Sequence, residues 1–194
     1  MSDNKINISS DLPTIHRRAL VAESRLFKIE QIELEFSNGE NRTYERMSGS
    51  GRGAVMVVPV VSDQEFIVVS EYGAGSHKYE LGFPKGLIDP GETPEEAANR
   101  ELKEEIGFGA KQFVKLKTLS TAPSYFNAQM HIFMAFDLYP EKLEGDEPEP
   151  LQVINWQWDN IEELIARDDF SEARSVSALF MALKQLAQDK KEIS

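Results

Sequence analysis

Three glutamates that follow residue 100 have the types and the spacing to hold a metal ion. Glu101, Glu104 and Glu105 are separated by three and four positions, so on a helix their carboxylates would share one face and repel one another. A cation is expected to compensate this charge, because hard oxygen ligands of this kind suit Mg²⁺ or Mn²⁺. Mg²⁺ also commonly binds substrate phosphates. The pattern therefore predicts a magnesium site for cutting diphosphates.

The residues around these glutamates argue against the main alternative, which is a solvated acidic helix. Most charge runs are wet surface, and the glutamates alone would favour that interpretation. Gly86, Glu92, Arg100 and Gly107 complete a longer pattern. Seven fixed identities in this spacing would arise by chance with a probability on the order of 10⁻⁹ per starting point. We expect Glu92 and Arg100 to hold the loop and the helix in register.

A helix must carry this face, and the sequence marks both of its ends. Thr93 or the turn before it supplies a start signal, and Pro94 suits the first helical position. Gly107 can adopt the left-handed conformation that ends a helix. Apolar residues recur between these limits with the spacing of one buried stripe, at Ala97, Ala98, Leu102 and Ile106. The sequence therefore predicts a helix that begins at Pro94 and stops at Gly107.

Two flanking segments could complete the chemistry. Residues 139–150 form a loop that is rich in acidic residues and prolines, and its Glu147 and Glu149 are candidates for a mobile general base. The alternative is an exposed acidic surface loop. On the other side, a tight turn would aim the carbonyl or the ammonium group of Lys85 at the site. An ordinary turn at the end of a strand is the alternative for Lys85.

Four further residues are candidates for substrate binding. Arg46 and Arg52 could contact phosphate, because guanidinium groups bind phosphate bidentately. Plain surface charge is the alternative for both. Glu80 is an acidic residue shortly before the metal helix, and Tyr125 belongs to a turn with adjacent aromatic residues. Such a turn suits stacking on a purine, and core packing is the alternative for Tyr125.

Composition and charge limit the class of protein. The chain has 194 residues, no cysteine and a formal net charge of −12. This length suits one well-cored domain with a small appendage, and the lack of cysteine excludes a disulfide scaffold and fits a reducing cytoplasm. The negative charge disfavours nucleic acid and anionic membranes as partners. Because no signal peptide or membrane-spanning run is found, we expect a soluble cytoplasmic protein.

Strand and helix patterns predict a mixed α/β fold. After a flexible lead of about a dozen residues, residues 26–36 and 41–47 are expected to form a hairpin around Asn38-Gly39. Residues 54–61 and 65–70 are expected to form a second hairpin. The remaining predicted elements are strands at 114–120, 130–138 and 153–158 and helices at 161–166 and 175–188. The expected class is a mixed sheet with helices packed around it.

These motifs resemble those of the Nudix hydrolase superfamily, and especially of its bacterial members that hydrolyse ADP compounds. The stretches YELGF, KGLIDPGE, EAANRELKEE, APSYF and LEGDEPEPL carry the resemblance, which covers most of residues 30–185. It implies a Nudix α/β/α sandwich, with a mixed β-sheet between helices, over residues 49–194. It also implies that residues 1–48 form an N-terminal extension and β-hairpin that contribute to a homodimer interface.

The same resemblance implies an activity and assigns its residues. The implied reaction is Mg²⁺-dependent hydrolysis of the pyrophosphate bond in ADP-ribose, NADH and diadenosine polyphosphates, with AMP released and Mn²⁺ able to substitute. The family's metal-binding glutamates match positions 101, 104 and 105. The main-chain carbonyl of Lys85 matches a further ligand. Glu147 or Glu149 occupies the loop that provides the base or another metal contact.

One departure from the family pattern and two other functions stay open. Gly73 stands near a position where related ADP-ribose enzymes often carry a substrate-binding arginine, which argues against exclusive specificity for ADP-ribose. A nucleoside triphosphate pyrophosphohydrolase would use the same glutamates and release pyrophosphate. A non-catalytic nucleotide-sensing module would share the fold, although the intact glutamate pattern argues against it.

Overall fold

Two compact units make up the chain, which is represented by a computed structural model that describes residues 11–49 and 51–192. The first unit contains the described residues up to Gly51 together with the loop Ala122–Asn127. The second contains Arg52–Thr121 and the chain from Ala128 onward. The sequence gives no sign that a loop from the second half joins the first unit. The division into domains at residue 48 stays a prediction.

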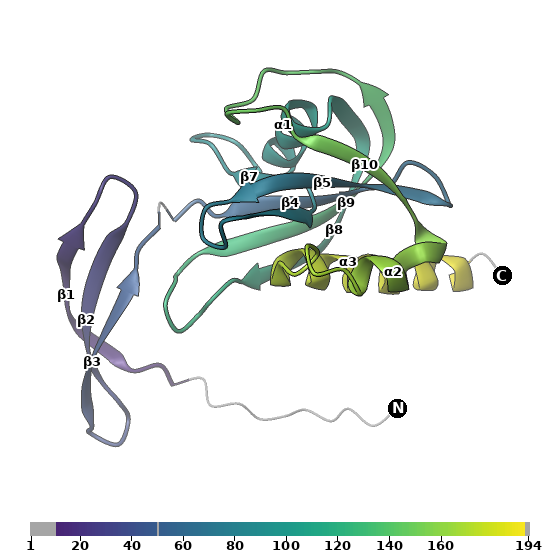
Figure 1. Cartoon of the computed structure of the whole chain (residues 1–194). Coiled ribbons are helices and arrows are strands. Elements are labelled where there is room, and N and C mark those ends of the chain that lie inside the picture. Colours follow the sequence, from purple (N-terminus) through teal and green to yellow (C-terminus); the bar gives the residue numbers. More distant parts are fainter. Residues whose placement is uncertain (1–10, 50, 193–194) are drawn as a thin grey trace. The chain divides into compact units, whose positions relative to one another are not determined.

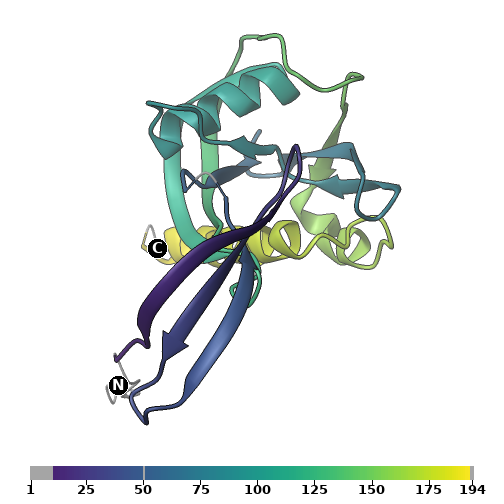
Figure 2. The same cartoon turned by 90° about the vertical axis from the view of Figure 1, so that its left-hand side faces the viewer.

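The first unit is built on a three-stranded antiparallel sheet in the order β1-β2-β3 (Figures 1 and 2). Its strands are β1 (Thr14–Glu23), β2 (Lys28–Glu35) and β3 (Asn41–Met47). The predicted hairpin of the last two strands is confirmed. Gly39 takes a φ of +83° in the connecting turn, a conformation that glycine adopts without a steric penalty.

Strand β1 was not predicted, because its sequence lacks a buried face. Nine of its ten residues are exposed and one is half-buried, so no apolar alternation marks it. The flexible lead was expected over about the first dozen residues, and most of that segment, residues 1–10, lies outside the described residues. Pairing with β2, rather than side-chain burial, makes Thr14–Glu23 a strand.

The second unit contains two sheets. A mixed four-stranded sheet has the order β7-β4-β9-β8, with β4 and β9 parallel, and an antiparallel three-stranded sheet has the order β10-β5-β6. The strands of the mixed sheet are β4 (Ala54–Pro59), β7 (Lys85–Leu87), β8 (Phe108–Ser120) and β9 (Gln129–Pro140). Those of the antiparallel sheet are β5 (Glu65–Gly73), β6 (Lys78–Gly82) and β10 (Gln152–Gln157).

The prediction of a second hairpin from residues 54–61 and 65–70 is wrong. Strands β4 and β5 belong to different sheets. In the described structure, one isolated bridge between Val60 and Phe66 and a turn hydrogen bond from the Val61 N–H to the Glu65 carbonyl oxygen link these segments. Strand β4, which is buried almost throughout, pairs with β9 along its whole length and with β7 over its first three residues, rather than with β5. A strand buried on both faces is a continuous apolar run, and its sequence does not identify its neighbours.

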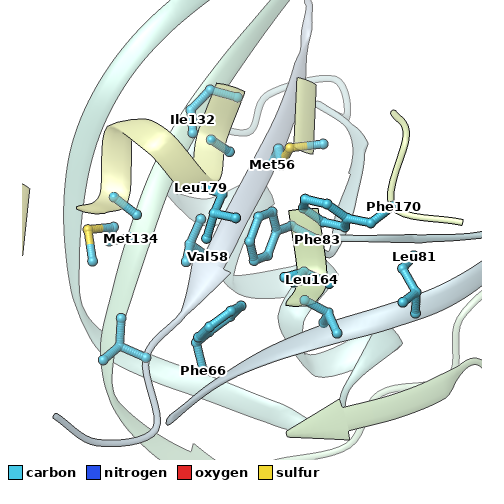
Figure 3. Packing of buried hydrophobic residues seen from close by; sticks show 14 of the residues in the cluster. Met56, Val58, Phe66, Leu81, Phe83, Ile132, Met134, Leu164, Phe170 and Leu179 are labelled. Carbon is cyan, nitrogen blue, oxygen red and sulfur yellow. The ribbon is translucent and has the colours of Figure 1, made fainter. Parts of the chain in front are cut away.

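Alternate residues of the central strands pack into two separate cores. Met56 and Val58 of β4 belong to the core beneath the C-terminal helices, whereas Val55 and Val57 belong to the core beneath the first helix. This alternation follows from the period of two residues in a strand. Figure 3 shows the first of these cores, in which Met56, Val58, Phe66, Ile132 and Leu179 gather around Phe83.

Helices cover both sides of these sheets, which confirms the α/β sandwich (Figure 1). Helix α1 lies on one side, and α2 and α3 lie on the other. In chain order they are α1 (Pro94–Glu105), the short 3₁₀ helix η1 (Trp158–Asn160), α2 (Ile161–Ile165) and α3 (Ala173–Glu192). Among the described residues, no helix is both long and apolar enough to cross a membrane.

Candidate functional site

Helix α1 is fixed at both ends by the residues that the sequence marks. The hydroxyl of Thr93 accepts a hydrogen bond from the Glu96 backbone N–H at 3.2 Å, and the Glu96 carboxylate accepts one from the Thr93 N–H at 2.8 Å. This reciprocal capping box satisfies donors that the first helical turn leaves free. Pro94 occupies the first turn, and Gly107 follows the helix with a φ of +76°. The predicted helix is confirmed.

The glutamate face of α1 consists of Glu101, Glu104 and Glu105. Glu101 is 7% exposed and Glu105 is 5% exposed. Burial raises the pKa of Glu101 to about 7 and the pKa of Glu105 to about 8, because a carboxylate that loses its hydration is harder to ionise. The Oε2 atom of Glu105 has no hydrogen-bond partner among the described residues. A buried oxygen without a partner is costly, and a cation could supply one.

Arg100 compensates part of this charge. Its Nη1 atom donates hydrogen bonds of 2.7 Å to both Glu101 and Glu104. Its Nε atom donates to Glu92 at 2.8 Å, and its Nη2 atom donates to the carbonyl oxygen of Leu87 at 2.8 Å. The guanidinium group therefore ties the preceding loop to α1, as predicted for Glu92 and Arg100.

Gly86 allows the strand before the loop to approach the glutamate face closely. A Cβ atom at this position would lie 2.0 Å from Oε1 of Glu101 and 2.1 Å from its Cδ. No side chain fits there unless Glu101 moves. The glycine in the motif thus has a local reason, which is the space taken by a buried carboxylate.

Lys85 contacts the glutamate face through its backbone. Its N–H donates a hydrogen bond of 3.1 Å to Oε1 of Glu105. Its ammonium group forms an ion pair with Glu71 of β5. The positive charge of Lys85 is therefore not available solely to balance the negative charge of the three glutamates. The proposed ligand role of the Lys85 carbonyl stays a prediction.

The acidic loop, residues 141–151, passes beside α1 and has no regular secondary structure. A Cβ atom at Gly145 would lie 2.2 Å from Oε2 of Glu147 and 3.5 Å from the Cβ of Glu104. Glu147 also contributes to the raised pKa of Glu101, after burial and other charges. Glu149 has a different neighbour, because its Oε1 accepts a hydrogen bond of 2.5 Å from the Tyr79 hydroxyl. The two candidate bases therefore have distinct surroundings.

Two cavities share Glu71 and Tyr72 in their walls, and the first of them borders the acidic loop. The first, which we name the tyrosine cavity, has a volume of about 580 Å³ and is also lined by Tyr79, Glu147 and Glu149. The second, which we name the serine cavity, has a volume of about 370 Å³. Its lining includes Lys85, Glu80, Ser76 and Ser171. Both cavities thus adjoin residues that contact the glutamate face.

The remaining predicted residues divide between the two units. In the second unit, Arg52 donates a hydrogen bond of 2.9 Å to the carbonyl oxygen of Ile88, in the loop before α1, and Glu80 lines the serine cavity. Arg46 and Tyr125 belong to the first unit.

Both residues of the first unit have local contacts. Arg46 forms two hydrogen bonds with Glu30 across the β2–β3 pair, at 2.8 and 2.9 Å. Tyr125 is 69% exposed, and its carbonyl oxygen accepts a hydrogen bond from Met47. Their roles in substrate binding stay predictions.

Sequence reasoning missed Glu71 and did not assign Tyr79 a role. Glu71 pairs with Lys85 and lines both cavities, and Tyr79 holds Glu149. Their partners are 14 and 70 positions away in the chain, so no local spacing reveals them. One weak signal existed for Glu71, which is a charged residue two positions after the apolar run of β5.

The donor set fits a hard divalent cation. Carboxylate oxygens suit such ions, and Oε2 of Glu105 is available for one. Within residues 11–49 and 51–192, no group of three His, Cys, Asp or Glu side chains is arranged as a ready-made metal site. Arg100 holds one oxygen each of Glu101 and Glu104. Binding of a cation by all three glutamates would therefore compete with this guanidinium group.

Comparisons with known proteins point to one family. Residues 13–46 match the NudE-type Nudix hydrolase N-terminal domain, and residues 51–180 match the NUDIX domain. The ADP compounds hydrolase NudE of Escherichia coli (strain K12) is 57% identical over 174 residues, which are 90% of this chain and 93% of that protein. The ADP-ribose pyrophosphatase of Bacillus subtilis (strain 168) is 28% identical over 88% of this chain and 96% of that protein.

A solved structure gives the same result. The crystal structure of an ADP compounds hydrolase resembles this chain with a TM-score of 0.87 and 55% sequence identity. The match covers 94% of this chain and 98% of that chain. The likeness therefore includes both units and is not limited to the glutamate motif.

Proposed function

Because the chain belongs to the Nudix hydrolase family, we propose that it hydrolyses the pyrophosphate bond of ADP-linked compounds and releases AMP. The observation that carries this proposal is the 57% identity to an ADP compounds hydrolase over nine-tenths of the chain. The buried glutamate face beside the tyrosine cavity supports it. ADP-ribose, NADH and diadenosine polyphosphates are the proposed substrates.

Nudix hydrolases generally need divalent metal ions, and we propose Mg²⁺ here, with Mn²⁺ able to substitute. Glu101, Glu104 and Glu105 would hold the ion, and the carbonyl oxygen of Lys85 would add a further ligand. When bound, such an ion supplies positive charge that stabilises the phosphoryl group during attack by water. Arg100 would then keep Glu92 and the loop in place while the carboxylates turn toward the ion.

The proton of the attacking water goes to a carboxylate of the acidic loop. Of the two candidates, Glu147 has the better position, because it lies beside Gly145 and Glu104. Glu149 is engaged by Tyr79. A general base must lie within reach of the proton that it removes, so nearness to the glutamate face favours Glu147.

Four residues, two from each unit, are proposed to bind the substrate. Arg52, which is fixed to the loop before α1, is the proposed phosphate contact in the second unit. Glu80 would accept hydrogen bonds from sugar hydroxyls in the serine cavity. In the first unit, Arg46 would contact phosphate and Tyr125 would stack on the purine.

We also propose that the protein is a homodimer in a reducing cytoplasm. The sheet of the first unit exposes large apolar side chains, and among the described residues its one buried hydrophobic side chain is Ile32. Three-stranded sheets need a packed apolar face to be stable, which a second copy could provide. The absence of cysteine fits a reducing compartment.

A substrate panel tests the proposed reaction. We would incubate the purified protein with Mg²⁺ and with ADP-ribose, NADH, diadenosine triphosphate or a nucleoside triphosphate, and separate the products by chromatography. AMP from the ADP-linked compounds is the expected result. Pyrophosphate from the triphosphate alone would favour a nucleoside triphosphate pyrophosphohydrolase, and no metal-dependent product would favour a nucleotide-sensing module.

Glu105→Gln tests the assignment of the glutamate face. This variant keeps the shape of the side chain but lacks the negative charge that would hold the ion, so turnover should fall by orders of magnitude. The protein should stay folded, because removal of a buried charge does not cost packing. Steady-state rates and circular dichroism would be measured together. Wild-type turnover by a folded Glu105→Gln would contradict the assignment.

A further inference from the structure

The start of the acidic loop is fastened to α1. The backbone N–H of Leu143 donates a hydrogen bond of 3.1 Å to the carbonyl oxygen of Lys103. The Lys103 ammonium group also forms an ion pair of 2.9 Å with Glu141. The end of the loop joins β10, where Gln152 pairs with Ser70 of β5. These contacts fix residues 141–143 and 152, and leave a span of eight residues between them.

In the described structure that span has a single side-chain hydrogen bond, and at its end Leu151 packs against the core beneath α1. From Glu144 to Leu151, the hydrogen bond between Glu149 and the Tyr79 hydroxyl is the only one that any side chain forms with a described residue. Pro148 and Pro150 flank Glu149, and proline restricts both its own backbone and that of the residue before it. Fixing Glu149 therefore restricts Glu147 as well, because Pro148 is the only residue between them.

Tyr79 is itself held in place. It belongs to β6, where it pairs directly with Tyr72 of β5. The two rings are in edge contact, with their centroids 5.8 Å apart. The hydroxyl of Tyr72 is hydrogen-bonded to Nδ1 of His77 at 2.7 Å. The hydrogen bond with Glu149 and its negative charge raise the pKa of Tyr79 above its ordinary value, so the phenol stays a donor at neutral pH.

We propose that Tyr79 is a positioning residue that anchors the acidic loop through Glu149 and so keeps Glu147 beside the glutamate face. This inference rests on the proposed function, in which Glu147 is the general base. It assigns separate roles to the two loop glutamates. Glu147 accepts the proton of the attacking water, and Glu149 accepts the hydrogen bond that fixes the loop.

Three variants separate anchoring from catalysis. Tyr79→Phe keeps the ring and removes the donor, Glu149→Ala removes the acceptor, and Glu149→Gln keeps an acceptor oxygen but cannot act as a base. We expect the first two to lower kcat about tenfold or more with little change in KM, because a loosened base is misplaced by about 1 Å. Glu149→Gln should stay within about threefold of wild type, since neutral hydrogen bonds retain part of the strength of charge-assisted ones.

A double variant and a measurement of hydrogen exchange complete the test. The Tyr79→Phe, Glu149→Ala double variant should be no slower than either single variant, because both changes remove one shared contact. Hydrogen exchange measured by mass spectrometry should be faster in residues 143–152 of both single variants. Tyr44→Phe removes the hydroxyl of an exposed tyrosine in the first unit and should leave exchange in this loop unchanged.

Each contrary outcome has a distinct meaning. If Glu149→Gln loses turnover as fully as Glu147→Gln while Tyr79→Phe does not, Glu149 is the base and the proposal is overturned. Unchanged kcat and unchanged exchange in Tyr79→Phe would overturn it as well. If the wild-type protein hydrolyses no ADP-linked compound, the proposed function fails, and the exchange measurement still decides whether Tyr79 anchors the loop.

Discussion

Gly86 of β7 lies directly beside the Glu101 carboxylate of α1. Its Cα lies so close to Glu101 that a Cβ atom would overlap the carboxylate. The atoms in conflict belong to the end of a flexible side chain, so the fold could tolerate a methyl group by moving that carboxylate. The position of Glu101, rather than the stability of the sheet, therefore depends on this glycine.

Gly86→Ala should lower kcat/KM by about 100-fold or more, because a displacement of about 1 Å in a catalytic group has effects of that size. The midpoint of thermal unfolding should change little. Gly75→Ala is a matched control, since a Cβ atom at Gly75 would meet nothing within 4 Å. Rates and melting curves for both variants would check this. Equal activity of Gly86→Ala and wild type would contradict this prediction, because it would show that turnover does not depend on the position of Glu101 beside Gly86.

The sequence predicted residues whose partners are near in the chain. The spacing of Glu101, Glu104 and Glu105 on one helix face follows from helical geometry alone. Glu92 and Arg100, eight positions apart, were expected to hold the loop and the helix in register, and their side chains are hydrogen-bonded to each other. The contact between Tyr79 and Glu149 crosses 70 positions, and only the folded arrangement of β6 and the acidic loop creates it.

Helix α3 begins with an acidic cap. Glu172 accepts hydrogen bonds from the backbone N–H and the hydroxyl of Ser175, at 2.8 and 3.0 Å, and from Nε of Arg174 at 2.6 Å. Burial opposes the ionisation of Glu172, but these donors outweigh it, and the pKa of the carboxyl is lowered from its ordinary value of 4.5. A negative charge at a helix start is also favoured by the helix dipole.

Glu172→Gln should lower the free energy of unfolding by about 1 kcal/mol at neutral pH. Because the folded pKa is lowered, this contribution is present above the unfolded value and is lost as pH falls through the folded one. The difference between variant and wild type should therefore shrink below pH 4.5. Urea unfolding of variant and wild type at neutral pH and at a pH below 4.5 would measure this difference in the free energy of unfolding. Asp168→Asn, which removes an exposed carboxylate nearby, is the matched control and should change the free energy of unfolding little at neutral pH.

Elements with one buried face were predicted well, and elements without one were not. The stripe of α1 and the apolar spacing of α3 mark both helices in the sequence. Strand β1 is exposed on both faces, and β4 is buried on both faces. Neither pattern alternates, so the sequence did not reveal the first strand or the sheet neighbours of the second.

Among its described residues, the sheet of the first unit has one buried hydrophobic side chain, Ile32. Its strands and their connection expose Ile15, Leu20, Val21 and Phe27 by 40–55%. We infer that these apolar side chains contribute to an interaction surface, since large exposed apolar patches mark such surfaces. At the scale of the whole molecule, the proposed homodimer would give this sheet the covered face that one chain does not supply.

Sedimentation should therefore show a species of about twice 21.9 kDa. Leu20→Glu should shift it toward the monomer, because a charge placed in an apolar interface must be desolvated on association. Phe180→Glu, which changes a 54% exposed side chain on α3, should leave the dimer intact. A dimer that survives Leu20→Glu and dissociates with Phe180→Glu would place the interface on the second unit.

By itself, the sequence determined the glutamate face, the ends of α1 and the α/β class, because helix spacing, capping and apolar periodicity act over a few residues. It could not decide that β4 and β5 lie in different sheets, or that the loop Ala122–Asn127 joins the first unit. Both features depend on which surfaces pack against each other when segments distant in the sequence come together. The tertiary structure likewise separated Glu147 from Glu149, since only folding brings Tyr79 to one of two otherwise similar carboxylates.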